Sequence, residues 1–390
     1  MHHQKLAFPL IASLVLCAGW TISACSSTST AAIGPAGDAG NDATQPTGDD
    51  AGPASDDGGG TTPDGSVTLA KACGDWAQAR CTRLDSCSNA TYTVVHYGSQ
   101  ATCVTNSTAQ CTTDLAASQT AATPSYFEGC ANAMTTESCS DLFNANPPAA
   151  CTPLAGPGAV GATCFVAAQC QSTYCAVAQF ATCGTCAAVP KSGDACVVDA
   201  DCGSRNQLTC SKAGTCVAYG ASGGSCDKDD PCGSGLTCVG AKPLKAIAGS
   251  CMPSGSTVGA TCDASEETAA GCDAELSLAC DPATSLCIAE ALVGANATCG
   301  LFVDGGLSRC ESAGTCLIPT SDAGTDDDAG DSGAAPVANT TPGSCVAAAA
   351  NGAACNSTST PGCIPPAKCV IADGGADQGT CQLDDPTSCL

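Results

Sequence analysis

Cysteine constrains this chain more than any other residue, because it occupies 36 of the 390 positions and recurs in units of four. The remaining apolar residues are mostly Ala and Val, and aromatic residues make up only 3%. Such side chains bury little surface, so covalent bridges must supply what a hydrophobic core cannot. The expected fold class is a small disulfide-rich one, with a disulfide-laced helical domain followed by short four-cysteine modules that have little regular secondary structure.

The N-terminus has the features of an export signal. Lys5 precedes an apolar run over residues 6–16, which is too short for a comfortable membrane span. Ile22-Ser23-Ala24-Cys25 resembles the lipobox of bacterial lipoproteins, so residues 1–24 are predicted to be a lipoprotein signal peptide. The resemblance implies that Cys25 is the lipidation site, and Ser26 after it favours the outer membrane. The alternative is an ordinary signal peptide followed by an incidental cysteine.

Two segments are too polar to fold. Residues 25–67 are rich in Asp, Gly and Pro and are expected to form a disordered acidic tether. The same composition returns at 318–343, which is expected to be a disordered acidic insert. The formal net charge is −25 without a basic cluster, so nucleic acid is not an expected partner.

Residues 68–153 hold eight cysteines in a helical pattern. Apolar and cysteine positions recur three or four residues apart over 69–87, again over 100–119, and from Pro124, with a last short helix near Cys139. Thr123 before Pro124 is a helix start, and Ser125 with Glu128 has capping-box spacing. The first pattern comprises Leu69, Cys73, Trp76, Arg80, Cys81, Leu84 and Cys87.

Cysteine spacing in this domain favours one way of joining two helices. Cys73 and Cys81 are eight residues apart, as are Cys103 and Cys111. Two antiparallel helices with that spacing can be laced by Cys73–Cys111 and Cys81–Cys103. Eight cysteines allow 105 connectivities, so this lacing is a geometric preference.

Residues 160–390 form a cysteine-rich repeat array, which we expect to be a rod of small modules. The array can be divided in two ways. One division begins each unit after a small-residue turn such as Gly161-Ala162-Thr163, but it leaves Cys183 and Cys389 far apart in the sequence without a module. Shifting the division by one cysteine leaves Cys164 and Cys183, which are near neighbours and candidate disulfide partners. We expect the shifted division, whose units are 170/175/186/196, 202/210/216/226, 232/238/251/262, 272/280/287/299, 310/316/345/355 and 363/369/381/389.

The array resembles a known extracellular module. The segments Cys196-Val-Val-Asp-Ala-Asp-Cys202 and Cys226-Asp-Lys-Asp-Asp-Pro-Cys232-Gly-Ser-Gly-Leu-Thr-Cys238 are similar to the N-terminal cysteine-rich region of Dickkopf proteins. Bacterial surface lipoproteins with Dickkopf-like repeats also look like this chain. The resemblance implies a disulfide-rich extracellular module, and it names no ligand.

Residues suited to catalysis are scarce. His96 is the one histidine outside the signal segment, and we interpret it as a packing or surface residue. Cys183-Gly-Thr-Cys186 is the lone CxxC, interpreted as two structural half-cystines because no βαβ pattern surrounds it. The carboxylates of Asp326, Asp327 and Asp328 are candidate calcium ligands, but their spacing does not match an EF-hand loop and such runs are common in acidic linkers.

The sequence therefore predicts a non-enzymatic protein without a cofactor or a resident metal, exported and lipid-anchored at the bacterial outer membrane or cell surface. The lipid is its predicted membrane contact, and its partner is an unidentified protein or glycan that binds the scaffold. Two alternatives stay open: a structural envelope protein without a specific ligand, and a periplasmic thiol-redox or metal-binding protein.

Overall fold

The computed structural model describes most of the chain from Val67 onwards. The described residues are 67–389 except for 179–180, 204–206, 212, 228–230, 243–246, 302–305, 319–341, 358 and 372–376. The predicted signal peptide, Cys25 and nearly all of the tether therefore lie outside the described residues. So does the acidic insert with Asp326, Asp327 and Asp328, except at its ends, where Gly343 opens a β-strand instead of belonging to the insert.

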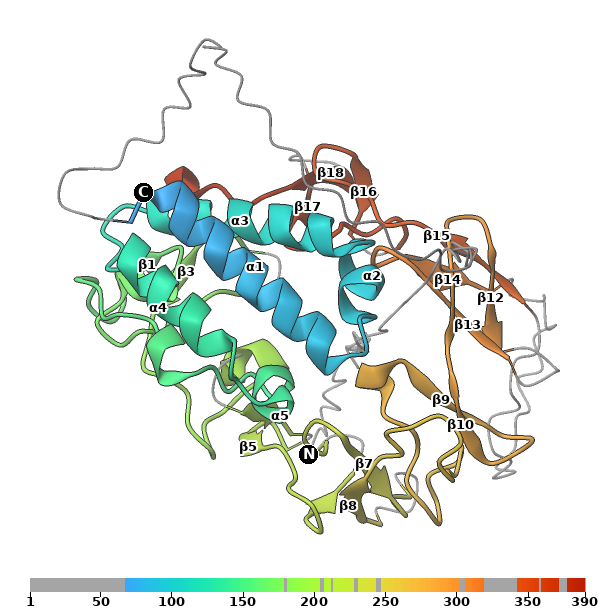
Figure 1. Cartoon of the computed structure of the whole chain (residues 1–390). Helices are drawn as coiled ribbons and strands as arrows, with labels where there is room; N and C mark the ends of the chain where they lie inside the picture. The colour runs from blue at the N-terminus through green and yellow to red at the C-terminus, as the bar shows by residue number, and fades with distance from the viewer. Residues whose placement is uncertain are drawn as a thin grey trace, which may run out of the picture.

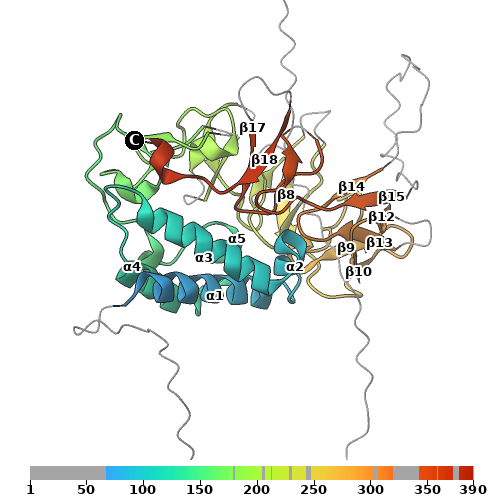
Figure 2. The ribbon, with the colours of Figure 1, turned by 90° about the horizontal axis from the view of Figure 1, so that it is seen from above.

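The N-terminal domain is helical, and the helices begin where the sequence indicates. The long helix α1 packs against both α3 and α4 (Figures 1 and 2). Side chains of Thr68, Ser99, Thr123 and Ser138 accept hydrogen bonds from backbone N–H groups in the first turn of the helix that follows each of them. The helices are α1 (Leu69–Cys87), α2 (Tyr92–Tyr97), α3 (Gln100–Ala116), α4 (Pro124–Met134) and α5 (Cys139–Phe143).

Disulfides lace these helices together. Cys73 bonds Cys111 and Cys81 bonds Cys103, with Cα–Cα distances of 5.4 and 6.1 Å, as the eight-residue spacing predicts. The other two pairs of this domain are Cys87–Cys139 and Cys130–Cys151. Beside the first bridge, the rings of Trp76 and Phe127 pack edge-to-face at 5.5 Å.

The rest of the described chain consists of six small modules with a common topology. In each module the third and fourth cysteines lie on an antiparallel hairpin, and the strand of the first cysteine pairs with the outer edge of the fourth cysteine's strand. This gives the sheet orders β1-β3-β2, β6-β8-β7 and β16-β18-β17, and in module five β12-β15-β14 is part of a five-stranded sheet of order β11-β13-β12-β15-β14. In modules two and four the first strand shortens to one bridge, Ala195 with Thr215 and Thr261 with Leu286.

The strands of the first three modules are β1 (Thr163–Cys164), β2 (Cys175–Ala176), β3 (Gly184–Cys186), β4 (Leu208–Cys210), β5 (Cys216–Ala218), β6 (Ser225–Cys226), β7 (Leu236–Val239) and β8 (Gly249–Pro253). Those of the last three are β9 (Leu278–Asp281), β10 (Leu286–Ala289), β11 (Ala291–Val293), β12 (Thr298–Leu301), β13 (Leu307–Cys310), β14 (Thr315–Leu317), β15 (Gly343–Val346), β16 (Ala354–Asn356), β17 (Lys368–Ile371) and β18 (Gln378–Gln382).

A tight turn starts every module. The residue three positions before the first cysteine has a positive φ in all six modules, from 65° at Asn296 to 93° at Gly193. Its N–H donates to the carbonyl of the fourth cysteine, whose own N–H donates to the residue after the turn; in module one these bonds join Gly161, Ala162 and Cys186. Glycine suits this position because it adopts a positive φ without steric cost. The other turn residues are Gly223, Gly259 and Gly352.

The disulfide pattern shows that the shifted division of the array was wrong. Within each module the first cysteine bonds the third and the second bonds the fourth, beginning with Cys164–Cys175 and Cys170–Cys186. Cys164 therefore does not pair with Cys183. The modules begin at the turn, as in the rejected division. Their bridges are Cys196–Cys210, Cys202–Cys216, Cys226–Cys238, Cys232–Cys251, Cys262–Cys280, Cys272–Cys287, Cys299–Cys316, Cys310–Cys345, Cys355–Cys369 and Cys363–Cys381.

The cysteines that this division leaves over bond each other. Cys183 of module one is joined to Cys389 near the C-terminus, across 206 residues. The two cysteines are far apart in the sequence and adjacent in space, because the array curves back until its two ends meet. The closing disulfide makes the described array a covalent ring.

In the view of Figure 1 the modules curve around the helices, and Figure 2 shows that α1 lies at one face of the molecule with the modules on its other side. Ser312 and Ala313 of module five donate backbone hydrogen bonds to Val94 and Val95 of α2. Asn106 of α3 donates to the Pro365 carbonyl of module six. A rod of modules, which the repeats suggested, is therefore not what the structure shows. Further contacts join module one through Gln169 to Ser118, module three through Ser234 to Asn144, and module four through Ser277 to Thr91.

Candidate functional site

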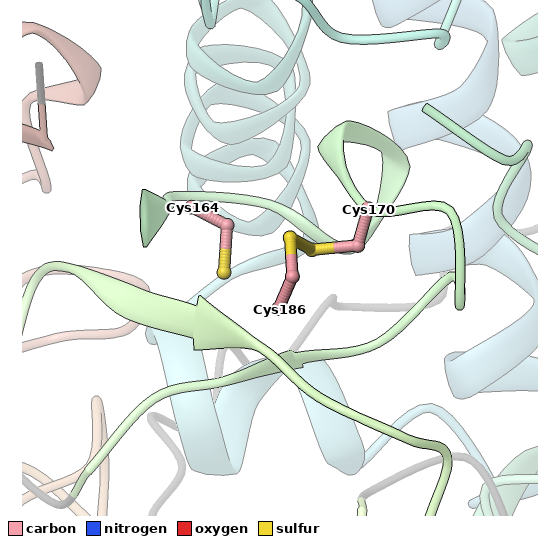
Figure 3. Close-up of side chains that lie close together, drawn as sticks. All are labelled: Cys164, Cys170 and Cys186. Carbon is pink, nitrogen blue, oxygen red and sulfur yellow. A yellow bond between two sulfur atoms is a disulfide. The ribbon is translucent and has the colours of Figure 1, made fainter. Parts of the chain in front are cut away.

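The crossed disulfides are the repeated chemical feature of the modules. Figure 3 shows the Cys170–Cys186 bond of module one beside the sulfur of Cys164, which bonds Cys175. The sulfurs of Cys164, Cys170 and Cys186 lie within 4.8 Å of one another, and all three residues are buried. Together the two bridges form the centre of the module.

A cluster of three sulfurs also has the dimensions of a metal site. A cysteine ligates a metal as a thiolate, however, and each of these sulfurs is already in a disulfide. The same holds for the equivalent clusters in modules two to five. In the oxidised protein these clusters act as the covalent core of each module.

The CxxC sequence does not form a redox pair in this structure. Cys183 bonds Cys389 and Cys186 bonds Cys170, so the two cysteines of Cys183-Gly-Thr-Cys186 belong to different bridges. In thioredoxin-like chemistry the two cysteines of the CxxC sequence form and break one disulfide with each other. The interpretation as two structural half-cystines agrees with this arrangement.

Polar contacts reinforce the closure of the ring. The Thr182 hydroxyl donates to Asp384 Oδ1 at 3.3 Å, and Lys368 Nζ lies 2.6 Å from Asp384 Oδ2. Lys368 also donates to the Ala181 carbonyl at 3.4 Å. Cys183 and Cys389 are partly exposed here, in contrast to the buried Cys170 and Cys186.

His96 lies on α2, where the helical domain meets modules four and five. Its ring packs against Tyr92 with centroids 4.2 Å apart. Burial lowers the pKa of His96 to about 4, and the charges of Arg309 and Arg80 act in the same direction. The imidazole is therefore neutral at pH 7, and it makes no hydrogen bond to another described residue. This environment agrees with a packing role.

A second titratable group lies at the same junction. Glu275 of module four accepts a hydrogen bond from the Ser234 hydroxyl of module three. Burial raises the pKa of Glu275 to about 7, and nearby Asp273 adds to the rise. Spacing did not indicate Glu275, because it is buried only where module four packs on α2 and Ser234 of module three reaches it.

The hairpin loop between the third and fourth cysteines varies most among the modules. It holds five residues in module two and 28 in module five. The strands that flank it keep one register, with the third and fourth cysteines directly opposite each other in all six modules. A constant bridge pattern therefore carries loops of very different lengths.

Comparison with known proteins gives no match for this chain among family models, curated proteins or solved structures. Within the part of the chain that the structure describes, no helix is both long and apolar enough to cross a membrane.

Proposed function

We propose that this protein is a non-enzymatic binding or adhesion scaffold, exported and held at the cell surface by a lipid on Cys25. The observation that carries the proposal is the combination of a constant disulfide framework with hairpin loops of five to 28 residues. Frameworks of this kind tolerate loop variation because the bridges, and not the loops, determine stability. The ligand class is a protein or a glycan.

The extent of disulfide bonding supports an oxidising location. All 34 described cysteines are bonded, in 17 disulfides. Disulfides persist in extracellular and periplasmic compartments, whereas cytosolic reductants keep thiols reduced. The lipobox resemblance of residues 22–25 and the similarity of the repeats to Dickkopf modules point to the same location.

Counting free thiols separates the scaffold from the thiol-redox alternative. Native protein is treated with a thiol-reactive maleimide, with and without denaturant, and then weighed by mass spectrometry. The scaffold predicts no labelling of residues 67–389 in either condition. Labelling of both Cys183 and Cys186 in the native protein would favour the redox alternative.

Binding is tested with the loops altered and the bridges kept. The protein is applied to a glycan array and to a panel of purified surface proteins, beside a variant in which residues 319–341 are replaced by a short Gly-Ser turn. A ligand of the array should bind the wild type and lose affinity when residues 319–341, or residues 243–246, are replaced. A control variant shortens the predicted tether, residues 26–66, which should leave affinity unchanged. If no surface glycan or protein binds, the structural envelope alternative gains support.

The lipid anchor has its own test. Cells that express the protein are fed an alkyne-labelled fatty acid, and the purified chain is examined for the label. The proposal predicts labelling of the wild type and none of Cys25→Ala, which should be released from the membrane fraction. An unlabelled wild type would leave an ordinary signal peptide as the explanation.

A further inference from the structure

The helical domain contains a cavity of about 450 Å³, within the size range of small-molecule sites. Trp76, Arg80 and Leu84 of α1 line it at positions four residues apart, so they share one face of the helix. Phe127 and Met134 of α4 contribute to the apolar wall, and Phe143 of α5 extends it. Ala167 and Ala168 of module one also line the cavity, so the ring of modules helps to form it.

Arg80 brings a positive charge to this apolar wall. Its Nη1 donates to the hydroxyls of Tyr97 and Ser107 at 3.3 and 3.4 Å, and these are its hydrogen bonds within the described residues. Arg309 differs, because Glu290 Oε2 lies 2.5 Å from its guanidinium. No carboxylate of the described residues forms such an ion pair with Arg80. Arg80 is partly buried, and a partly buried guanidinium without a carboxylate partner attracts an anion.

The two acidic residues of the cavity wall do not neutralise Arg80. Asp114 is on α3, and the bridges Cys73–Cys111 and Cys81–Cys103 place it near the start of α1, roughly 15 Å along the axis from Arg80. Glu137 is buried beside Arg83, which donates to its carbonyl oxygen. The charges that act on the Glu137 carboxyl are those of Asp141 and Arg83.

We propose that this cavity binds an amphiphilic monocarboxylate, with the carboxylate on Arg80 and the apolar body against Trp76, Phe127 and Phe143. The guanidinium has donors left for a two-pronged contact with a carboxylate. One unneutralised cation matches one negative charge. A phosphate monoester carries nearly two negative charges and would bring the second one into a wall that already holds Asp114 and Glu137. Small inorganic anions are not the preferred ligands, because they have no apolar body and would leave the apolar wall in contact with water. This inference is independent of any partner bound by the module loops.

Sodium octanoate is the probe, used below its micellar concentration on the full chain carrying Trp20→Phe. Since the chain has two tryptophans, Trp76 is then the one indole, and its fluorescence reports on the cavity. We expect octanoate to change the Trp76 emission saturably, to release heat in calorimetry, and to raise the melting temperature. Octylamine, with the same chain and the opposite charge, should bind at least about tenfold more weakly, a difference of about 1.4 kcal/mol.

Two variants connect binding to Arg80. Arg80→Met keeps the length of the side chain and removes its charge, so octanoate affinity should fall about tenfold or more. Lys71→Met is the matched control, because it changes the net charge equally from an exposed position on α1 outside the cavity. It should leave the affinity unchanged.

Three results would overturn the proposal: no octanoate binding to the wild type, equal octanoate binding by Arg80→Met, or tighter binding of octylamine than of octanoate. The comparison of octanoate with octylamine uses unaltered cavity residues, so it decides the matter even if Arg80→Met does not fold. A failed result here leaves the binding scaffold proposal intact, because that rests on the module loops.

Discussion

The disulfide that closes the ring offers the sharpest test of how this fold is stabilised. Replacing both Cys183 and Cys389 by serine removes the bridge without leaving a free thiol. Neither residue belongs to a crossed pair, so all six module cores remain intact. The expected loss in the free energy of unfolding therefore comes almost entirely from the entropy of loop closure, with little change in packing.

The size of the loss follows from the length of the loop. Cys183 and Cys389 are separated by 206 residues, for which the chain-entropy relation gives about 5 kcal/mol. The other bridges shorten the shortest covalent path in the unfolded chain to about 100 residues, and the relation then gives about 4.7 kcal/mol. The two values are close because the cost depends on the logarithm of length. Engineered and natural bridges often deliver less, so we expect a loss of about 3–5 kcal/mol.

The assay is guanidinium unfolding of the oxidised protein, followed by circular dichroism, with small-angle scattering of the native state. The double serine variant should unfold at lower denaturant and show a larger radius of gyration. Asp384→Asn is the control at the same place, because it removes the contact with Lys368 and keeps the bridge. That contact is partly exposed and should contribute less than about 1 kcal/mol. A loss below about 1 kcal/mol in the double variant, with unchanged dimensions, would refute the closed ring as a source of stability.

Three further predictions concern the junctions and turns. Glu275 has a pKa of about 7 in the folded protein, above its ordinary 4.5, so the folded state loses stability as pH rises from about 4.5 through 7. Glu275→Gln should therefore raise the melting temperature at pH 8 and change it little at pH 4. Equal effects at the two pH values would contradict this. His96 gives the opposite pH dependence, because folding lowers its pKa from 6.5 to about 4, and stability should decline as pH drops from about 6.5 to 4. His96→Phe should abolish that decline in thermal scans. A decline that persists in this variant would assign it to another group. Gly259 has φ +83°, and no atom lies within 4 Å of a Cβ built on it. Gly259→Ala should therefore lower the free energy of unfolding by about 1–2 kcal/mol through backbone strain alone. Asn296→Gly at the equivalent turn should be neutral or slightly stabilising. Chemical denaturation measures both, and a neutral Gly259→Ala would show that the turn does not need its left-handed residue.

The local features of the fold were readable from the sequence. Thr123 before Pro124 marks the start of α4, and the repeated apolar and cysteine positions give α1 its full length. The lacing of α1 to α3 was also accessible, because two cysteines eight residues apart on each helix can face each other only in a few ways. α2 was missed, since its six residues are too few to show a period.

The candidate sites were less accessible. Arg80 stands in the apolar pattern of α1, which is an unusual place for a charge and was the available signal for the cavity. The sequence could not show whether a carboxylate from another element neutralises it, because that depends on how the bundle and module one pack. Glu275 and His96 likewise owe their pKa values to burial between elements that are far apart in the chain.

Sequence by itself determined the disulfide-rich class, the helical domain and the repeated modules, because turn residues, helix caps and cysteine spacing act within a few residues of one another. Small turn residues such as Gly161 precede the first cysteine of each module, but in the sequence they left two divisions of the array open. Tertiary structure alone decided the phase of the array, since the pairing of Cys183 with Cys389 depends on the modules curving around the helices. Cys183 and Cys389 are 206 positions apart in the sequence, and local cysteine spacing does not show that the fold brings them together.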